Sequence, residues 1–130
     1  MNIGVDSMQV FKCMKCGKMV MMMKNSSCDT FCCGEEMVEL KANTTDGAVE
    51  KHVPFVEIDE KTIKVSVGEV AHPMLEEHYI EWIALETNKG VHIVNLKAGE
   101  EPVAYYHLEN EEAVCAYAYC NLHGLWKKDI

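Results

Sequence analysis

The sequence predicts a mainly β protein in two parts, a small N-terminal metal-binding module followed by an antiparallel β-sandwich. Two observations support this prediction. From Gln9 to about Leu40 the chain is dense in cysteine and has almost no long apolar periodicity. After Ala48 it contains short segments rich in Val, Ile and aromatic residues, separated by turn signals. No segment shows a sustained helical period or an internal repeat. We expect the module at 8–40, a linker at 41–47 and the sandwich at 48–130.

Composition limits the possible partners and the compartment. The net charge is −9, with 48% hydrophobic and 25% charged residues. Such an acidic chain lacks the clustered Lys and Arg that bind nucleic acid or an anionic membrane. No signal peptide is visible, and the apolar run Met19 to Met23 is too short to cross a bilayer. The seven cysteines are an odd number, which favours metal ligands in a reducing compartment over disulfides, and we expect a cytoplasmic protein.

The N-terminal module is too small to form a sufficient apolar core, and a metal ion is the usual remedy. Residues 1–7 look like a leader, to which we assign no function. Cys13-Met14-Lys15-Cys16-Gly17 is a metal knuckle, because a two-residue gap lets both thiolates face one ion. The adjacent pair Cys32-Cys33 can complete a four-thiolate iron site, and Cys28-x3-Cys32 is an alternative pair that spacing alone does not exclude. A structural zinc site is the competing interpretation.

The predicted strands follow the linker, whose polar sequence ends in Asp46-Gly47. Residues 62–67 alternate cleanly, with Ile63, Val65 and Val67 on one face. Evenly spaced short strands of this kind are typical of a sandwich. The expected strands are His52–Asp59, Thr62–Val67, Tyr79–Glu86, Val91–Leu96, Val103–Leu108 and Ala113–Cys120.

The C-terminal loop predicts a second metal site. Cys120 and His123 stand three residues apart, so that both can reach one ion. The remaining donors must come from upstream, where His52, His72 and His78 are the candidates. These four imidazoles and one thiolate are one ligand short of octahedral, as a catalytic metal requires. His92 and His107 are interpreted as ordinary lone histidines. A cupredoxin copper site uses a similar Cys and His, but no Met follows His123 to serve as the axial ligand.

With these residues in hand, the chain resembles desulfoferrodoxin, the two-iron class of superoxide reductase, from Met8 onward. Six motifs in the same order carry the resemblance: Cys13-Met14-Lys15-Cys16-Gly17, Cys32-Cys33-Gly34-Glu35-Glu36-Met37, Glu50-Lys51-His52-Val53-Pro54, Ala71-His72-Pro73-Met74, His78-Tyr79-Ile80-Glu81-Trp82 and Tyr119-Cys120-Asn121-Leu122-His123-Gly124-Leu125-Trp126. In one departure, Ala118 stands where many relatives have an acidic residue, so any contribution of that carboxylate is missing.

The resemblance implies a desulforedoxin-like module joined to an immunoglobulin-like sandwich, usually as a homodimer. It also implies two irons: one held by Cys13, Cys16, Cys32 and Cys33, the other by His52, His72, His78 and His123 with Cys120 as the axial ligand. Cys28 and Cys115 are then spare. The implied reaction reduces superoxide with one external electron and two protons, giving hydrogen peroxide without dioxygen. Rubredoxin is the usual electron donor of the family.

Two charged residues beside His52 are the candidate catalytic groups. Lys51 is expected to attract superoxide against the acidic field of the whole chain and to stabilise the peroxide that forms. Glu50 is expected to close onto the oxidised iron and help expel the product. A solvated surface pair is the competing interpretation of these two residues. For the whole chain, the competing functions are a one-electron carrier and a zinc-stapled interaction module.

Overall fold

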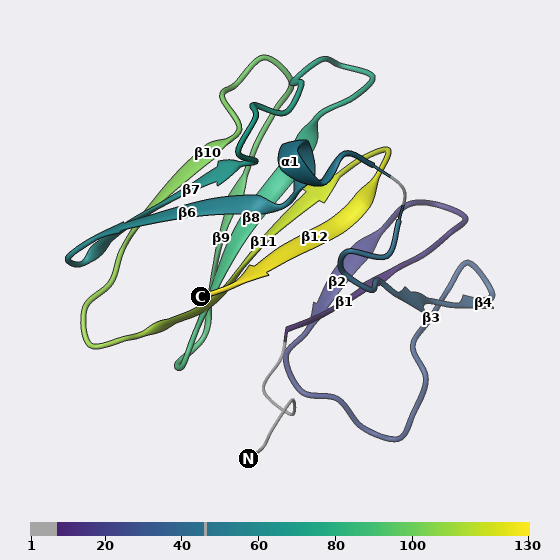
Figure 1. Ribbon diagram of the computed structural model, residues 1–130. Helices are drawn as coiled ribbons and strands as arrows, with labels where there is room; N and C mark the ends of the chain where they lie inside the picture. Colours follow the sequence, from purple (N-terminus) through teal and green to yellow (C-terminus); the bar gives the residue numbers. More distant parts are fainter. Residues whose placement is uncertain (1–7, 46) are drawn as a thin grey trace. The chain divides into compact units, whose positions relative to one another are not determined.

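The computed structural model describes residues 8–45 and 47–130, which form two compact units (Figure 1). The first unit ends at Lys41, and the second runs from Ala42 to Ile130. The expected leader at residues 1–7, together with Asp46 of the expected linker, lies outside the described residues.

The N-terminal unit consists of short strands around a very small core. Its strands are β1 (Gln9–Lys12), β2 (Met19–Met22), β3 (Phe31–Cys32), β4 (Glu35–Glu36) and β5 (Val38–Glu39). One antiparallel sheet has the order β2-β1-β5, and β3 pairs with β4. Among its described residues, the buried apolar side chains are Val10, Cys13 and Met37. So few buried groups cannot offset the conformational entropy of this unit, which supports the predicted dependence on a metal.

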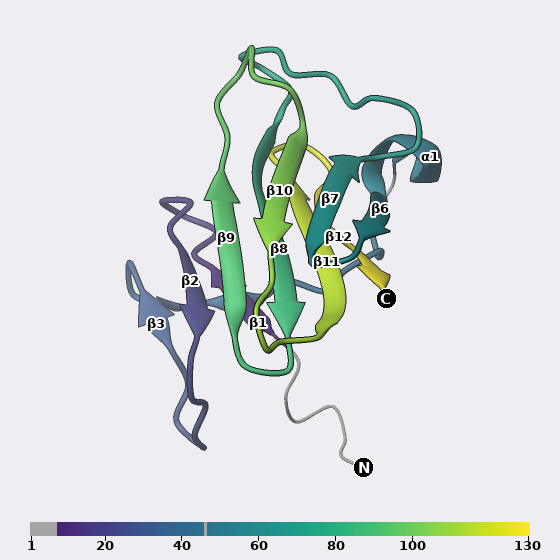
Figure 2. The same ribbon diagram turned by 90° about the vertical axis from the view of Figure 1, so that its left-hand side faces the viewer.

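The C-terminal unit is a sandwich of two antiparallel sheets, with strand orders β10-β7-β6 and β12-β11-β8-β9 (Figure 2). The predicted mainly β architecture is therefore confirmed. Its elements are α1 (Val49–His52), β6 (Pro54–Asp59), β7 (Thr62–Val67), β8 (Ile80–Thr87), β9 (Val91–Asn95), β10 (Val103–His107), β11 (Ala113–Cys120) and β12 (Gly124–Asp129).

The core lies between the two sheets, and the apolar face predicted for residues 62–67 is the face of β7 that is buried in it. Ile63, Val65 and Val67 are at most 3% exposed and pack in one cluster with Ile83 and Leu85 of β8. Inward-facing residues of β10 and β11 complete the cluster. Burying these branched side chains on one face of each strand is what fixes the strand register.

Two elements differ from the sequence-based prediction. His52 ends the short helix α1 instead of opening a strand, because a helix of four residues is too short to leave a periodic pattern. The expected C-terminal loop is confined to a turn, and Gly124–Asp129 continues as strand β12 beside β11. Gly124 has φ +81°, a conformation that glycine adopts without strain, and so lets the chain reverse directly into β12.

An irregularity in β8 positions its first residues next to the end of β11. Tyr119 pairs with Trp82, but Cys120 pairs with Ile80, so that Glu81 is an extra residue on β8. Such a bulge reverses the side-chain alternation. Ile80 is consequently fully buried in the core, in the same cluster as Cys120.

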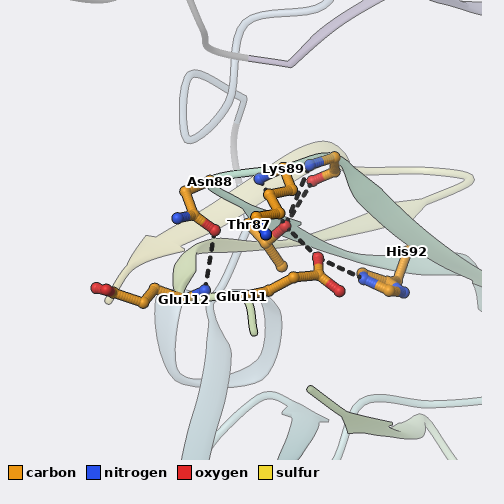
Figure 3. A network of polar contacts seen from close by, with 7 residues as sticks. Thr87, Asn88, Lys89, His92, Glu111 and Glu112 are labelled. Atoms are coloured by element: carbon orange, nitrogen blue, oxygen red, sulfur yellow. Dashed lines mark hydrogen bonds and ion pairs between the residues drawn. The ribbon is translucent and has the colours of Figure 1, made fainter. Parts of the chain in front are cut away.

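The other end of the β8–β11 pair is fastened by a polar network (Figure 3). Thr87 Oγ1 donates to a carboxylate oxygen of Glu111 at 2.6 Å, and His92 Nε2 lies 3.1 Å from the same oxygen. The backbone N–H groups of Asn88 and Glu112 bond across the same gap, each at 3.0 Å. The network thereby ties the β8–β9 turn to the loop that leads into β11.

Within the described residues, α1 is the one helix, and it is far too short to cross a membrane.

Candidate metal centres

Five side chains from separate segments converge at one end of the sandwich. One donor atom from each lies within 4.8 Å of the others. They are His52 at the end of α1, His72 after β7, His78 before β8, Cys120 at the end of β11 and His123 in the turn before β12.

The four imidazoles stand around a square. Neighbouring rings have centroids 4.6 Å (His52–His72), 4.7 Å (His72–His78), 5.0 Å (His78–His123) and 4.7 Å (His52–His123) apart, and their planes are nearly perpendicular, at 74–82°. The rings of His52 and His78 face each other across the square, 6.4 Å apart. The sulfur of Cys120 lies 3.8 Å from Nδ1 of His123.

Hydrogen bonds to backbone carbonyls determine which ring nitrogens face inward. Nδ1 of His52 donates to the carbonyl of Ala48, and Nδ1 of His72 donates to that of Pro73, each at 2.7 Å. Each Nε2 therefore carries a lone pair in the neutral ring, and these two Nε2 atoms lie only 3.0 Å apart. Two lone pairs at this distance repel each other unless a cation lies near both. Holding a histidine through its outer nitrogen is also typical of metal sites.

The third upstream histidine points to the same conclusion. Nε2 of His78 is buried and has no hydrogen-bond partner among the described residues. A buried polar atom without a partner costs free energy, which a bound metal ion would remove. The donor set therefore fits a metal ion.

Burial keeps these rings in the neutral form that binds metal. Loss of hydration lowers the pKa of His72 to about 4 and also lowers the pKa of His52 and of His78. Burial raises the pKa of the Cys120 thiol, against the opposing effect of nearby backbone N–H groups. A cation at the centre would favour the thiolate, as metal binding generally does.

The second cluster lies in the N-terminal unit and contains Cys13, Cys16, Cys32 and Cys33, with all sulfurs within 4.8 Å of one another. The sulfur of Cys32 is 3.7 Å from that of Cys16 and 3.9 Å from that of Cys33. Cys33 has φ +53°, and this left-handed conformation aims two consecutive side chains at one point. Cys28 is not part of the cluster.

The four thiols cannot ionise independently. The backbone N–H of Cys16 donates to the sulfur of Cys13 and lowers the pKa of Cys13 to about 6. Hydrogen bonding with Cys16 and the other thiols raises the pKa of Cys33 to about 12. Four thiolates together need a cation, so this cluster also fits a metal ion.

Comparison with known proteins agrees with both clusters. Residues 44–129 match the family model described as Desulfoferrodoxin. The chain is 46% identical over 122 residues to a desulfoferrodoxin homologue of Archaeoglobus fulgidus, covering 94% of this chain and 97% of that protein. It is 44% identical over 121 residues to the desulfoferrodoxin of Nitratidesulfovibrio vulgaris, covering 93% and 95% respectively. The chain belongs to the desulfoferrodoxin family.

Solved structures of superoxide reductases share the fold of this desulfoferrodoxin-family chain. The one from Treponema pallidum superposes with a TM-score of 0.80 at 34% identity, covering 95% of this chain and 99% of that chain. A one-iron superoxide reductase from Giardia intestinalis has a TM-score of 0.54 at 31% identity, covering 62% of this chain and 97% of that chain. The two candidate sites agree with a two-iron desulfoferrodoxin.

The expected catalytic pair lies on α1, directly before His52. Both Glu50 and Lys51 are exposed. Burial and the charge of neighbouring rings are the larger causes of the lowered pKa of His52 and of His78. The positive charge of Lys51 also lowers the pKa of both. Lys51 therefore lies near enough to these two rings for its charge to disfavour their protonation.

Several cysteines and histidines lie outside both clusters. Cys115 is buried and donates to a carboxylate oxygen of Asp129 at 3.5 Å, and burial raises its pKa to about 11. His92 pairs with Glu111, and His107 is exposed, as expected of lone histidines. Ala118 is fully buried in the core, so no carboxylate stands at that position.

Sequence analysis missed several residues that support the donors. The indole N–H of Trp126 donates to the carbonyl of His123 at 2.9 Å, and its ring stacks on His52 at 5.0 Å. The hydroxyl of Thr45 donates to the same carbonyl. A Cβ on Gly47 would lie 3.2 Å from both the His52 and Trp126 rings. Thr45 and Gly47 belong to the stretch expected to be a linker, where nothing in the local pattern signals this role.

Proposed function

We propose that His52, His72, His78, Cys120 and His123 hold the iron at which this superoxide reductase works, and that Cys13, Cys16, Cys32 and Cys33 hold a second iron. The observation that carries the first assignment is the inward-facing donor set. The Nε2 atoms of His52 and His72 lie 3.0 Å apart with their lone pairs facing each other. The buried Nε2 of His78 has no hydrogen-bond partner among the described residues. Such an arrangement favours a cation bound between the rings.

The reaction adds one electron and two protons to superoxide and yields hydrogen peroxide without dioxygen. When bound at the five-donor site, ferrous iron would supply that electron. The protein's own part is to keep the imidazoles neutral by burial and to hold their rings through backbone carbonyls. Five donors are one fewer than an octahedral ion accepts, so an ion held there would have one position for a small anion.

Lys51 and Glu50 are proposed to handle the charged substrate and product. Because the chain has a net charge of −9, attraction of an anion depends on a local positive charge. Lys51 provides that charge on α1, where it already acts on two of the rings. Glu50 is its exposed neighbour and is proposed to close over the site and help displace the product.

Partners and location form the rest of the proposal. We assign the external electron to a rubredoxin-like donor, and we expect a homodimer, as the resemblance implies. None of the seven cysteines, all of which the structure describes, is in a disulfide, which suits a reducing compartment such as the cytoplasm.

The test compares His72→Ala with His107→Ala as the matched control. Each protein is assayed for iron content, for the absorption bands of both iron–thiolate sites, and for peroxide formation with reduced rubredoxin. We expect His72→Ala to lose one iron, one band and the activity, while His107→Ala keeps all three. An unchanged His72→Ala protein would show that the metal uses other donors.

A further inference from the structure

Asn121 links the C-terminal turn to the segment that carries His78. Its side-chain oxygen accepts from the backbone N–H of Tyr79 at 2.9 Å. Its side-chain nitrogen donates to the carbonyl of Glu77 at 3.1 Å. The backbone N–H of Asn121 also donates to the carbonyl of Tyr79 at 3.2 Å. The side chain of Asn121 thus hydrogen-bonds the peptide groups on both sides of His78.

These hydrogen bonds are important because, in the part of the chain that the structure describes, no side chain or backbone group hydrogen-bonds the ring of His78. The rings of His52 and His72 are each held through Nδ1 by a backbone carbonyl. Among the described residues no hydrogen bond reaches the ring of His78, and its Nε2 is buried without a partner. Besides its edge contacts with the rings of His72 and His123, His78 is therefore oriented by the hydrogen bonds of its backbone. Leu75 bonds to the backbone of His78 itself, at 2.9 and 3.1 Å, and Asn121 fixes the peptides on either side.

We propose that Asn121 is a positioning residue, which orients the ring of His78 toward the other four donors. It stands between Cys120 and His123 in the sequence, so that the same short turn contributes two donors directly and orients a third. Replacing groups that orient metal ligands typically weakens metal binding about 10–100-fold. The inference rests on the proposed function, because it assumes that these five side chains bind iron.

The experiment uses the full-length iron-loaded protein with Asn121→Ala, Asn121→Asp and the control Asn88→Ala. Asn88 also accepts a backbone hydrogen bond through its side-chain oxygen, from Glu112 at 3.0 Å, at the far end of β8. Iron loss to a competing chelator is followed at the iron–thiolate absorption band of the His and Cys site. The band of the four-cysteine site serves as an internal reference, and thermal unfolding is recorded for each variant.

We expect Asn121→Ala to lower the iron affinity of the His and Cys site at least about tenfold and to shift its band. Asn121→Asp keeps the acceptor for Tyr79 but loses the donor to Glu77, so its affinity should fall as well. This variant decides the matter if Asn121→Ala does not fold. The control and the reference band should stay at wild-type values.

Two outcomes would overturn one claim each. If the Asn121 variants bind iron as tightly as wild type and keep its absorption band, Asn121 only connects the C-terminal turn to the segment around His78. The inference is then wrong. If the wild-type protein itself shows no iron–thiolate band from the His and Cys site, the proposed function fails instead.

Discussion

At the scale of single residues, the structure separates two electrostatic tasks. Burial lowers the pKa of the histidine rings and keeps them available as neutral donors. The proposed attraction of substrate needs a positive charge that remains in solvent, and Lys51 is exposed on α1. His52 and Lys51 show this most directly, because they are adjacent in the sequence and have opposite environments.

The role of Lys51 predicts a slower reaction with superoxide when its charge is removed. In Lys51→Ala we expect the second-order rate constant at low salt to fall about tenfold, the lower end of electrostatic steering effects. Pulse radiolysis measures this rate. The control Lys51→Arg keeps the charge and should react nearly as fast as wild type, with a similar salt dependence. An undiminished rate in Lys51→Ala would exclude the attraction role.

At the scale of elements, the position of α1 depends on a glycine in the loop after β7. A Cβ on Gly68 would lie 2.7 Å from the carbonyl oxygen of Val53 and 2.8 Å from that of Glu50. Both contacts involve backbone, which has little freedom to give way. The backbone N–H of Val70 bonds to the Glu50 carbonyl at 2.8 Å and fastens the helix from the same loop. The site therefore depends on close backbone contact beneath α1.

Gly68→Ala is expected to destabilise the protein by about 1–3 kcal/mol, the usual cost of overpacking. The matched control is Gly90→Ala, because a Cβ there would meet nothing within 4 Å. We expect the control to change the free energy of unfolding by no more than about 1 kcal/mol. Urea unfolding measures both, and equal stabilities would show that α1 adjusts without cost.

The network at the far end of β8 predicts a pH dependence of stability. The hydrogen bonds from Thr87 and then His92 lower the pKa of Glu111. A carboxyl with a lowered folded-state pKa stabilises the fold above its unfolded pKa, near 4.3, and loses that contribution as pH falls through the folded value. We expect Glu111→Gln to be less stable than wild type at pH 7, with the difference shrinking below pH 4.3. Urea unfolding at several pH values measures it, and a constant difference would refute the prediction.

At the scale of the whole molecule, the two units obtain their stability differently. The sandwich has a continuous apolar core shared by its two sheets. The described N-terminal unit buries only Val10, Cys13 and Met37 among its apolar side chains. We infer that the metal supplies much of the folding free energy of the smaller unit.

Cys13→Ser is therefore expected to unfold the N-terminal unit and leave the sandwich intact. Limited proteolysis should cleave the variant before Lys41, while the iron–thiolate band of the His and Cys site persists. Cys28→Ser is the matched control, since Cys28 is exposed and lies outside the cluster. Protection of the N-terminal unit in Cys13→Ser would show that it folds without its metal.

Sequence pattern predicts the strands because burial on one face imposes alternation, as in Ile63, Val65 and Val67. It also predicts the five donors of the sandwich site, since their spacing and the resemblance agree. Spacing alone could not choose between Cys28 and Cys33, and the resemblance supplied Cys33, because that choice depends on the positive φ of Cys33, a backbone property that spacing does not reveal.

The supporting contacts are beyond local pattern for a different reason. Asn121 bonds to residues more than forty positions away in the chain, and Thr45 bonds to His123 across an even longer separation. Such contacts exist only once the sheets have paired. Asn121 belongs to a motif that carries the resemblance, but the sequence around neither polar side chain reveals which distant backbone groups it bonds.

Because the five donors come from distant parts of the chain, metal supply should affect the abundance of the folded protein. Since they come from positions between His52 and His123, no short peptide retains the constellation, and an unfolded chain binds the ion weakly. Every ion captured by the native state therefore shifts the folding equilibrium, by mass action, toward that state. Under iron scarcity we expect a larger share of unfolded polypeptide, exposed to proteases, so that nutrient supply would govern the abundance of the protein as well as its activity.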